Sequence, residues 1–141
     1  MTDFFGSCKL HIGGIDYLLP AEALAFLEKG ACLVDLRSEF ETEIRSFRVD
    51  HVVYLPYTEL EKNYEVLSRE RPLILADAVG LHSKEALVFL RGKGYGPLAS
   101  LAGGIADWEK DGFPVQRGRY QPLNGPCPCM IRPKESDKPS T

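Results

Sequence analysis

The sequence LILADAVGLHS, from Leu73 to Ser83, combines the features that decide the fold of this chain. Its first four residues form a continuous apolar run, which is typical of a strand covered on both faces. The residues from Asp77 onward form a turn, and a helical apolar pattern begins at Ser83, which we expect to be the helix N-cap. A buried strand that passes through a short turn into a helix indicates a parallel sheet flanked by helices.

The rest of the chain repeats this strand-then-helix order. Continuous apolar runs that predict strands occupy residues 32–35, 52–55 and 98–101, and helical spacing occupies residues 21–29, 57–67 and 83–91. No Asn-Gly or Asp-Gly pair, the usual signal of a β-hairpin, separates two predicted strands, whereas strand-then-helix units recur. The pattern predicts an α/β fold with a parallel sheet and helices on both of its faces.

Composition limits the class of protein and of partner. The chain has 141 residues, of which 44% are hydrophobic, enough for one domain with its own core. The 17 Lys and Arg against 20 Asp and Glu give a net charge of −3, without a basic cluster. We therefore expect neither a nucleic-acid nor a membrane partner, and the apolar runs are too short for a signal or anchor, which predicts a cytoplasmic location. The oligomeric state stays open.

Proline divides the chain into two parts. Five of the ten prolines lie among the last twenty residues, beside polar and charged neighbours. We predict a folded domain at residues 8–118 and a proline-rich, flexible tail at residues 119–141. The tail contains the sequence Cys127-Pro128-Cys129.

The turn after residues 73–76 is a candidate binding loop. In parallel sheets, ligands bind beyond the carboxyl ends of the strands, where a loop enters a helix. Gly80 permits a positive φ, which lets successive N–H groups point inward, and the following helix adds its positive end. We therefore expect an anion-binding loop made by Asp77, Ala78, Val79, Gly80, Leu81, His82 and Ser83.

Several motifs resemble the rhodanese family over about residues 15–117. They are VDLRSEF at 34–40, Gly80 and Ser83 in the loop, Gly94-Tyr95, LAGGIADW at 101–108 and GFPV at 112–115, in the family's order. The resemblance implies a three-layer α/β/α fold with a five-stranded parallel sheet. It also implies a loop that reads C-x-x-G-x-R-S in active members, whose cysteine carries a sulfur as a persulfide to a thiophilic acceptor.

Two loop residues depart from the family's pattern. Asp77 stands at the position of the nucleophilic cysteine, and His82 at that of the loop arginine. Persulfide formation needs a soft thiolate, whereas a carboxylate is a hard oxygen base, so we expect no catalytic residue of the usual kind. We expect Asp77 to accept hydrogen bonds from the loop N–H groups instead.

Other residues are assigned structural roles. Asp35 and Arg37, at the end of a predicted strand, are expected to hold loops in place by hydrogen bonds. Trp108 lies three residues from Ile105 on a helical face and is expected to anchor the core. We interpret His11 as an ordinary surface or strand-end residue.

Two thiols in a polar tail contribute little to packing. Three interpretations therefore remain open for Cys127 and Cys129. They are candidate sulfur carriers or redox groups, or they form a metal site through Cys-x-Cys that Cys8 or a second chain completes, or they have no role. An extended segment from Val115 to Cys127 spans about 40 Å, which is enough to reach the loop.

The resulting functional hypothesis is a binding or regulatory module linked to sulfur metabolism, whose standard sulfurtransferase activity is absent. Its expected partner is a small oxyanion or a sulfur-relay protein, and we expect neither a cofactor nor a metal ion in the loop. The alternatives are a sulfurtransferase or sulfur carrier that uses Cys127 or Cys129, and a metal-binding protein that uses the same pair.

Overall fold

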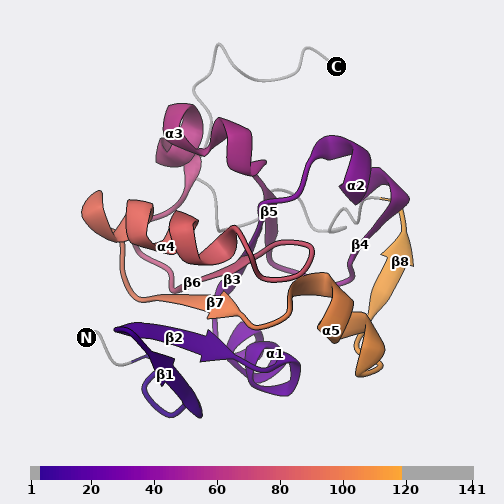
Figure 1. Ribbon diagram of the computed structural model, residues 1–141, viewed down its shortest axis with the longest axis horizontal. Helices are drawn as coiled ribbons and strands as arrows, with labels where there is room; N and C mark the ends of the chain where they lie inside the picture. Colours follow the sequence, from indigo (N-terminus) through magenta and orange to yellow (C-terminus); the bar gives the residue numbers. More distant parts are fainter. Residues whose placement is uncertain (1–3, 119–141) are drawn as a thin grey trace.

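A six-stranded sheet forms the centre of the computed structural model, which describes residues 4–118 (Figure 1). Its spatial order is β1 (Leu10–Ile12), β2 (Ile15–Leu18), β7 (Leu98–Leu101), β6 (Leu73–Ala76), β3 (Cys32–Asp35) and β5 (Val52–Tyr54). The strands from β2 to β5 in this order are parallel to one another, and only β1 is antiparallel. The predicted α/β fold is confirmed: five strands of the sheet are parallel, and β1 adds a sixth, antiparallel strand that was not predicted.

Helices cover both faces of this sheet. They are α1 (Pro20–Glu28), α2 (Glu39–Ile44), α3 (Leu60–Asn63), α4 (Ser83–Gly92) and α5 (Gly104–Lys110). Residues of α1 and α5 share one apolar core with one set of strand side chains, and residues of α3 and α4 share a second core with the alternate set. The continuous apolar runs are explained by this arrangement, because both faces of each central strand are buried.

The N-terminal β-hairpin was not predicted from the sequence. Strands β1 and β2 pair around Gly13 and Gly14, whose φ angles are 60° and 80°. A two-residue turn of this hand needs positive φ at both positions, and a Gly-Gly pair supplies it as well as Asn-Gly does. The apolar core also extends to Phe5, which precedes residue 8 and is 1% exposed.

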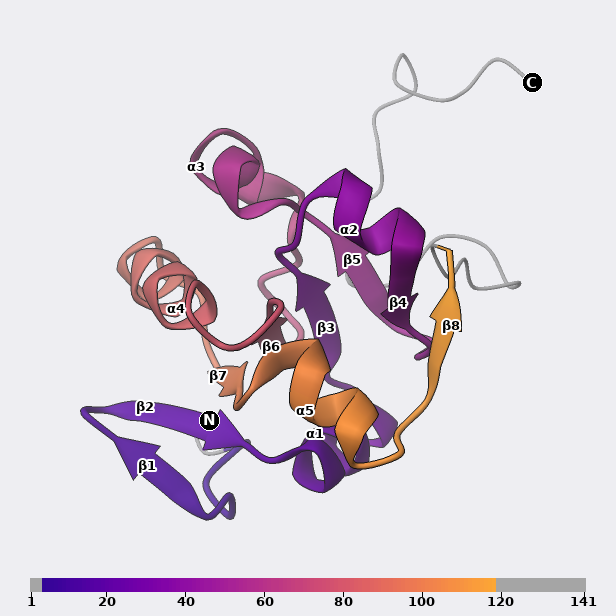
Figure 2. The same ribbon diagram turned by 45° about the vertical axis from the view of Figure 1, so that its right-hand side comes forward.

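A second, two-stranded sheet was also not predicted. It pairs β4 (Arg45–Phe47) with β8 (Val115–Arg117) in the antiparallel direction. Figure 2 shows this pair at the end of the molecule opposite the β1–β2 hairpin. Their sequences, RSF and VQR, contain no continuous apolar run of the kind that predicted β5, so nothing in them indicates a strand.

The prediction of a single helix over residues 57–67 is wrong. The structure has a 3₁₀ turn at Tyr57–Glu59, then α3, then a second 3₁₀ turn at Tyr64–Val66. The φ angles of Glu59 and Asn63 are −106° and −121°, far from the helical value of about −63°, so the turns are separate. Within residues 4–118, no helix has the length and apolar character needed to cross a bilayer.

Candidate functional site

The loop after β6 closes around the side chain of Asp77. The backbone N–H of Gly80 donates to Oδ1 at 2.5 Å, and the N–H groups of His82 and Ser83 donate to Oδ2 at 2.5 and 3.2 Å. Asp77 itself is only 3% exposed. The N–H groups that converge in this turn therefore point at a carboxylate that belongs to the chain.

The start of α5 holds this loop from the side (Figure 2). The N–H groups of Ile105 and Ala106 donate to the carbonyl oxygens of Asp77 and Ala78, at 2.9 and 3.1 Å. A Cβ atom on Gly104 would lie 2.3 Å from the Asp77 carbonyl oxygen, so a glycine is required for this approach. The Gly103-Gly104 pair of the sequence motif thus lets a helix end rest on the loop.

Ser83 does not cap α4, in contrast to the prediction. The N-cap is His82, without a side-chain capping bond, and Ser83 is the first helical residue. Its hydroxyl is fully buried and forms a 2.6 Å hydrogen bond with the Ser100 hydroxyl on β7. Ser83 therefore ties the start of α4 to the sheet.

The side chain of His82 lies outside the turn. It is exposed and stacks on the ring of Tyr57, with 4.5 Å between ring centroids. The Tyr57 hydroxyl donates to the Glu85 carboxylate at 2.5 Å, and this hydrogen bond raises the pKa of Tyr57 above its usual value. Only the backbone N–H of His82 points at the interior of the loop.

The rim of the loop is apolar and exposed. Val79 is 54% exposed and Leu81 is 71% exposed. Across the sheet edge, Ile12 of β1 is 61% exposed. A pocket of about 250 Å³ separates the loop from the hairpin, and Ile12 and Val79 line it together with Tyr17.

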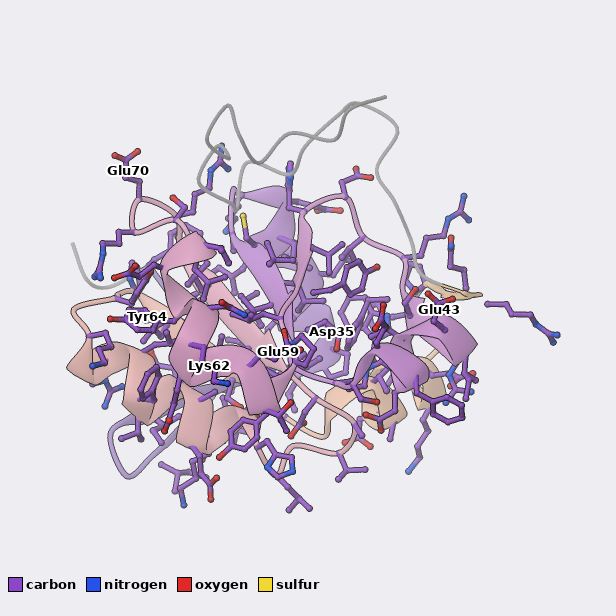
Figure 3. All side chains as sticks on the ribbon, turned by 90° about the horizontal axis from the view of Figure 1, so that it is seen from above. Asp35, Glu43, Glu59, Lys62, Tyr64 and Glu70 are labelled. Atoms are coloured by element: carbon purple, nitrogen blue, oxygen red, sulfur yellow. The ribbon has the colours of Figure 1, made fainter. Side chains whose placement is uncertain are left out.

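Asp35 and Arg37 form a buried ion pair at the end of β3. The Nε and Nη2 atoms of Arg37 donate to the two carboxylate oxygens of Asp35 at 3.0 and 2.9 Å. Asp35 is fully buried and lies among packed side chains, whereas Glu43 and Glu70 lie at the periphery (Figure 3). The pair fixes the backbone between β3 and α2, because the Arg37 N–H also donates to Asp35.

Trp108 lies in the core beneath the sheet. Its indole is fully buried, packs against the rings of Phe47 and Phe113, and donates a 2.8 Å hydrogen bond to the Pro114 carbonyl oxygen. It connects α5 to the segment that leads into β8.

The structure brings together three residues that sequence analysis did not connect. Cys8, His11 and Asp16 each offer a ligand atom, and these atoms lie within 4.8 Å of one another. His11 and Asp16 are partners across the β1–β2 hairpin, so a Gly-Gly turn read as a hairpin signal would have placed them side by side. The predictions for Cys127, Cys129 and the tail at residues 119–141 lie outside the described residues.

Comparisons with known proteins identify relatives of this domain. The sequence profile described as "Rhodanese: Rhodanese-like domain" matches residues 19–111. Among curated proteins, none matches the sequence.

Solved structures show the same fold. A rhodanese-related protein from Thermoplasma volcanium is 25% identical, with a TM-score of 0.66 over 72% of this chain and 98% of that chain. A rhodanese-like domain protein from Staphylococcus aureus is 18% identical, with a TM-score of 0.60 over 67% of this chain and 91% of that chain. A thiosulfate sulfurtransferase from Pseudomonas aeruginosa is 23% identical, with a TM-score of 0.65 over 74% of this chain but only 20% of that chain.

Proposed function

Because this chain belongs to the rhodanese-like domain family, we propose that it is a member without sulfurtransferase activity, in which Asp77 replaces the sulfur-carrying cysteine. Its role is then to bind a partner protein or to regulate one in sulfur metabolism. The observation that carries this proposal is the enclosure of the Asp77 carboxylate by three loop N–H groups.

The carboxylate occupies the donors that an anionic substrate would need. A hydrogen bond to a charged group contributes about 1.5–3 kcal/mol to stability, and Asp77 accepts three from the backbone. An external anion would have to displace these bonds and approach a buried group of like charge. The proposal therefore favours a partner protein over the small oxyanion that the sequence also suggested.

The loop also lacks a group that could carry sulfur. A carboxylate oxygen does not form a persulfide, because that requires a polarizable thiolate. The two cysteines within residues 4–118 lie elsewhere: Cys8 precedes β1, and Cys32 is the first residue of β3. Both are buried.

The exposed rim of the loop supports partner binding. Val79 and Leu81 present large apolar side chains to solvent at the mouth of a polar turn. Exposed apolar groups that gather beside a loop are typical of protein contact surfaces. Such a surface can be retained after the chemistry of the loop has been lost.

An assay with thiosulfate and cyanide tests the proposal. We expect the full chain to form no thiocyanate above background, because Asp77 cannot accept the sulfur. The double variant Asp77→Cys, His82→Arg should gain measurable turnover, since its loop keeps the converging N–H groups, and the single variant His82→Arg is the matched control.

Turnover by the unmodified chain would refute the proposal. The variant Cys127→Ser, Cys129→Ser then identifies the source of the activity. Activity that is lost in this variant would assign sulfur transfer to the tail, and activity that persists would assign it to one of the two remaining thiols, Cys8 or Cys32.

A further inference from the structure

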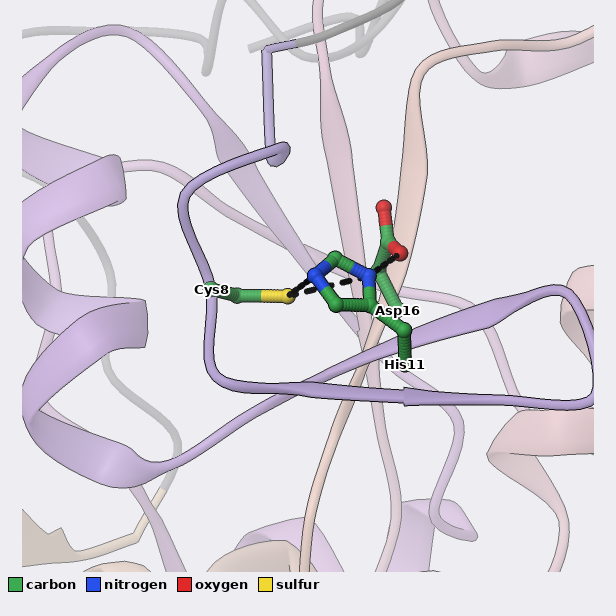
Figure 4. A group of neighbouring side chains, drawn as sticks. All are labelled: Cys8, His11 and Asp16. Carbon is green, nitrogen blue, oxygen red and sulfur yellow. Dashed lines mark hydrogen bonds and ion pairs between the residues drawn. The ribbon is translucent and has the colours of Figure 1, made fainter.

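A cluster of three potential ligands lies on the N-terminal hairpin (Figure 4). The Sγ atom of Cys8 is 3.9 Å from Nδ1 and 3.8 Å from Nε2 of His11, and this Nδ1 is 2.6 Å from Oδ1 of Asp16. Thiolate, imidazole and carboxylate are the three kinds of donor that zinc accepts in proteins. We propose that Cys8, His11 and Asp16 bind a divalent cation of the zinc type.

The fold places these residues before any cation binds. His11 and Asp16 lie opposite each other in the register of β1 and β2. Cys8 is held by its own N–H, which donates to the Phe5 carbonyl oxygen at 3.1 Å. The next N–H, that of Lys9, donates to Glu22 of α1 at 3.0 Å, which fixes this segment to the domain.

The distances are close to those of a tetrahedral zinc site. With Zn–S near 2.3 Å and Zn–N near 2.0–2.1 Å, the sulfur and nitrogen ligands lie about 3.6 Å apart. One zinc ion binds one ring nitrogen of a histidine, and Nδ1 is the nitrogen that faces Asp16. The observed separation of Cys8 Sγ from this Nδ1 is 3.9 Å.

The contact between His11 and Asp16 is shorter, because it is a hydrogen bond. Nitrogen and oxygen ligands of zinc lie about 3.4 Å apart, so this contact must open by less than about 1 Å. The side chains of His11 and Asp16 are 48% and 32% exposed, so core packing does not oppose the small rotations that open this contact.

Charge favours a cation at this cluster. Asp16 is one of its three donors, and the Glu22 carboxylate lies close by, because it accepts the N–H of Lys9 beside Cys8. These carboxylates attract a cation. When the cation binds, Cys8 releases its proton to solvent, and the charges of the thiolate and Asp16 balance the two charges of the metal. A fourth position remains for water or an external ligand.

Metal titration of the full chain tests the site. The chain is stripped with a chelator, dialysed, and titrated with zinc chloride alone and with cobalt chloride alone. We expect one ion per chain, and a thiolate-to-cobalt charge-transfer band that Cys8→Ser abolishes. His11→Ala and Asp16→Asn should each lower the zinc affinity by about tenfold or more.

Two control variants separate this site from other donors. His51→Ala removes a histidine outside the cluster, and Cys127→Ser, Cys129→Ser removes the tail thiols; both should keep the affinity and the band. Absence of stoichiometric binding would refute the proposal, as would affinity that survives His11→Ala but is lost in the tail variant. If Cys8→Ser does not fold, the exposed His11→Ala still decides. The thiosulfate assay is independent of these outcomes.

Discussion

The side chain of Asp77 determines which hydrogen-bond donors of the loop are available to solvent. The turn retains the positive φ of Gly80, at 94°, and the start of α4, so its N–H groups still converge. The carboxylate accepts three of these N–H groups from within. The donors that a bound anion would use are thus already paired with the carboxylate of Asp77.

Removal of this carboxylate should open the loop to external anions. In Asp77→Ala, the three N–H groups lose their acceptor, which should lower the free energy of unfolding by about 1–3 kcal/mol. Sulfate should then raise the melting temperature in a saturable way, because it binds only the folded loop. Differential scanning fluorimetry with sulfate and chloride at equal ionic strength measures this effect.

Asp111→Ala, which removes an exposed carboxylate of α5's C-terminal end, is the matched control and should respond to sulfate as the unmodified chain does. Equal sulfate stabilisation of the unmodified chain and Asp77→Ala would show that Asp77 does not block the loop.

At the level of elements, the segment from Tyr57 to Val66 depends on its neighbours for its shape. The Tyr95 hydroxyl, beyond the end of α4, donates to the carbonyl oxygens of Tyr64 and Leu67 at 3.0 and 2.9 Å. A long-range contact of this kind satisfies carbonyl groups at the end of the segment, where no further helical turn follows to donate to them. The broken helix is therefore stabilised by tertiary contacts that local spacing does not reveal.

Tyr95→Phe should weaken this connection and change the alkaline stability. Loss of the hydroxyl should cost about 0.5–1.5 kcal/mol at neutral pH. Burial raises the pKa of Tyr95, so its stabilising effect is present below the ordinary pKa of about 10 and is lost as the pH rises through the raised value. Urea unfolding at several pH values should show a smaller alkaline loss in Tyr95→Phe.

Tyr57→Phe is the control, because the pKa of Tyr57 is also raised but its ring lies at the surface beside His82. If Tyr57→Phe removes the alkaline loss and Tyr95→Phe does not, the connection through Tyr95 is not the cause.

For the whole molecule, the sheet divides the interior into two cores. Alternate residues of β6 point to opposite sides: Ile74 belongs to the core with α1 and α5, and Leu75 to the core with α4. Side chains of the two cores lie on opposite faces of the sheet, and the two clusters have no buried residue in common. The two cores should therefore contribute to stability independently.

Paired substitutions test this independence. Leu87→Ala in the α4 core should cost about 2–5 kcal/mol and Ile105→Val in the other core about 0.5–1.5 kcal/mol. Their double variant should show the sum within about 0.5 kcal/mol, measured by urea unfolding with the fluorescence of Trp108, the one tryptophan of the chain. A coupling free energy above about 1 kcal/mol would mean that the sheet transmits strain between the cores.

The candidate site was predictable only in part. Its location followed from a local rule, since a buried strand that enters a helix through a glycine-containing turn places the loop at the carboxyl edge of the sheet. The support that the loop receives from Gly104 was not predictable, because it depends on the approach of α5 across the sheet. The roles proposed for the loop residues and for the tail thiols stay predictions.

The sequence by itself determined the parallel central sheet and the helices on both of its faces, because continuous apolar runs and helical spacing act over a few residues. The tertiary structure alone decided which distant groups meet: β4 with β8, Tyr95 with the broken helix, and Gly104 with the Asp77 loop. The physical reason is that periodicity records which face of an element is buried, whereas partners are chosen by chain reversals and packing that join segments far apart in the sequence.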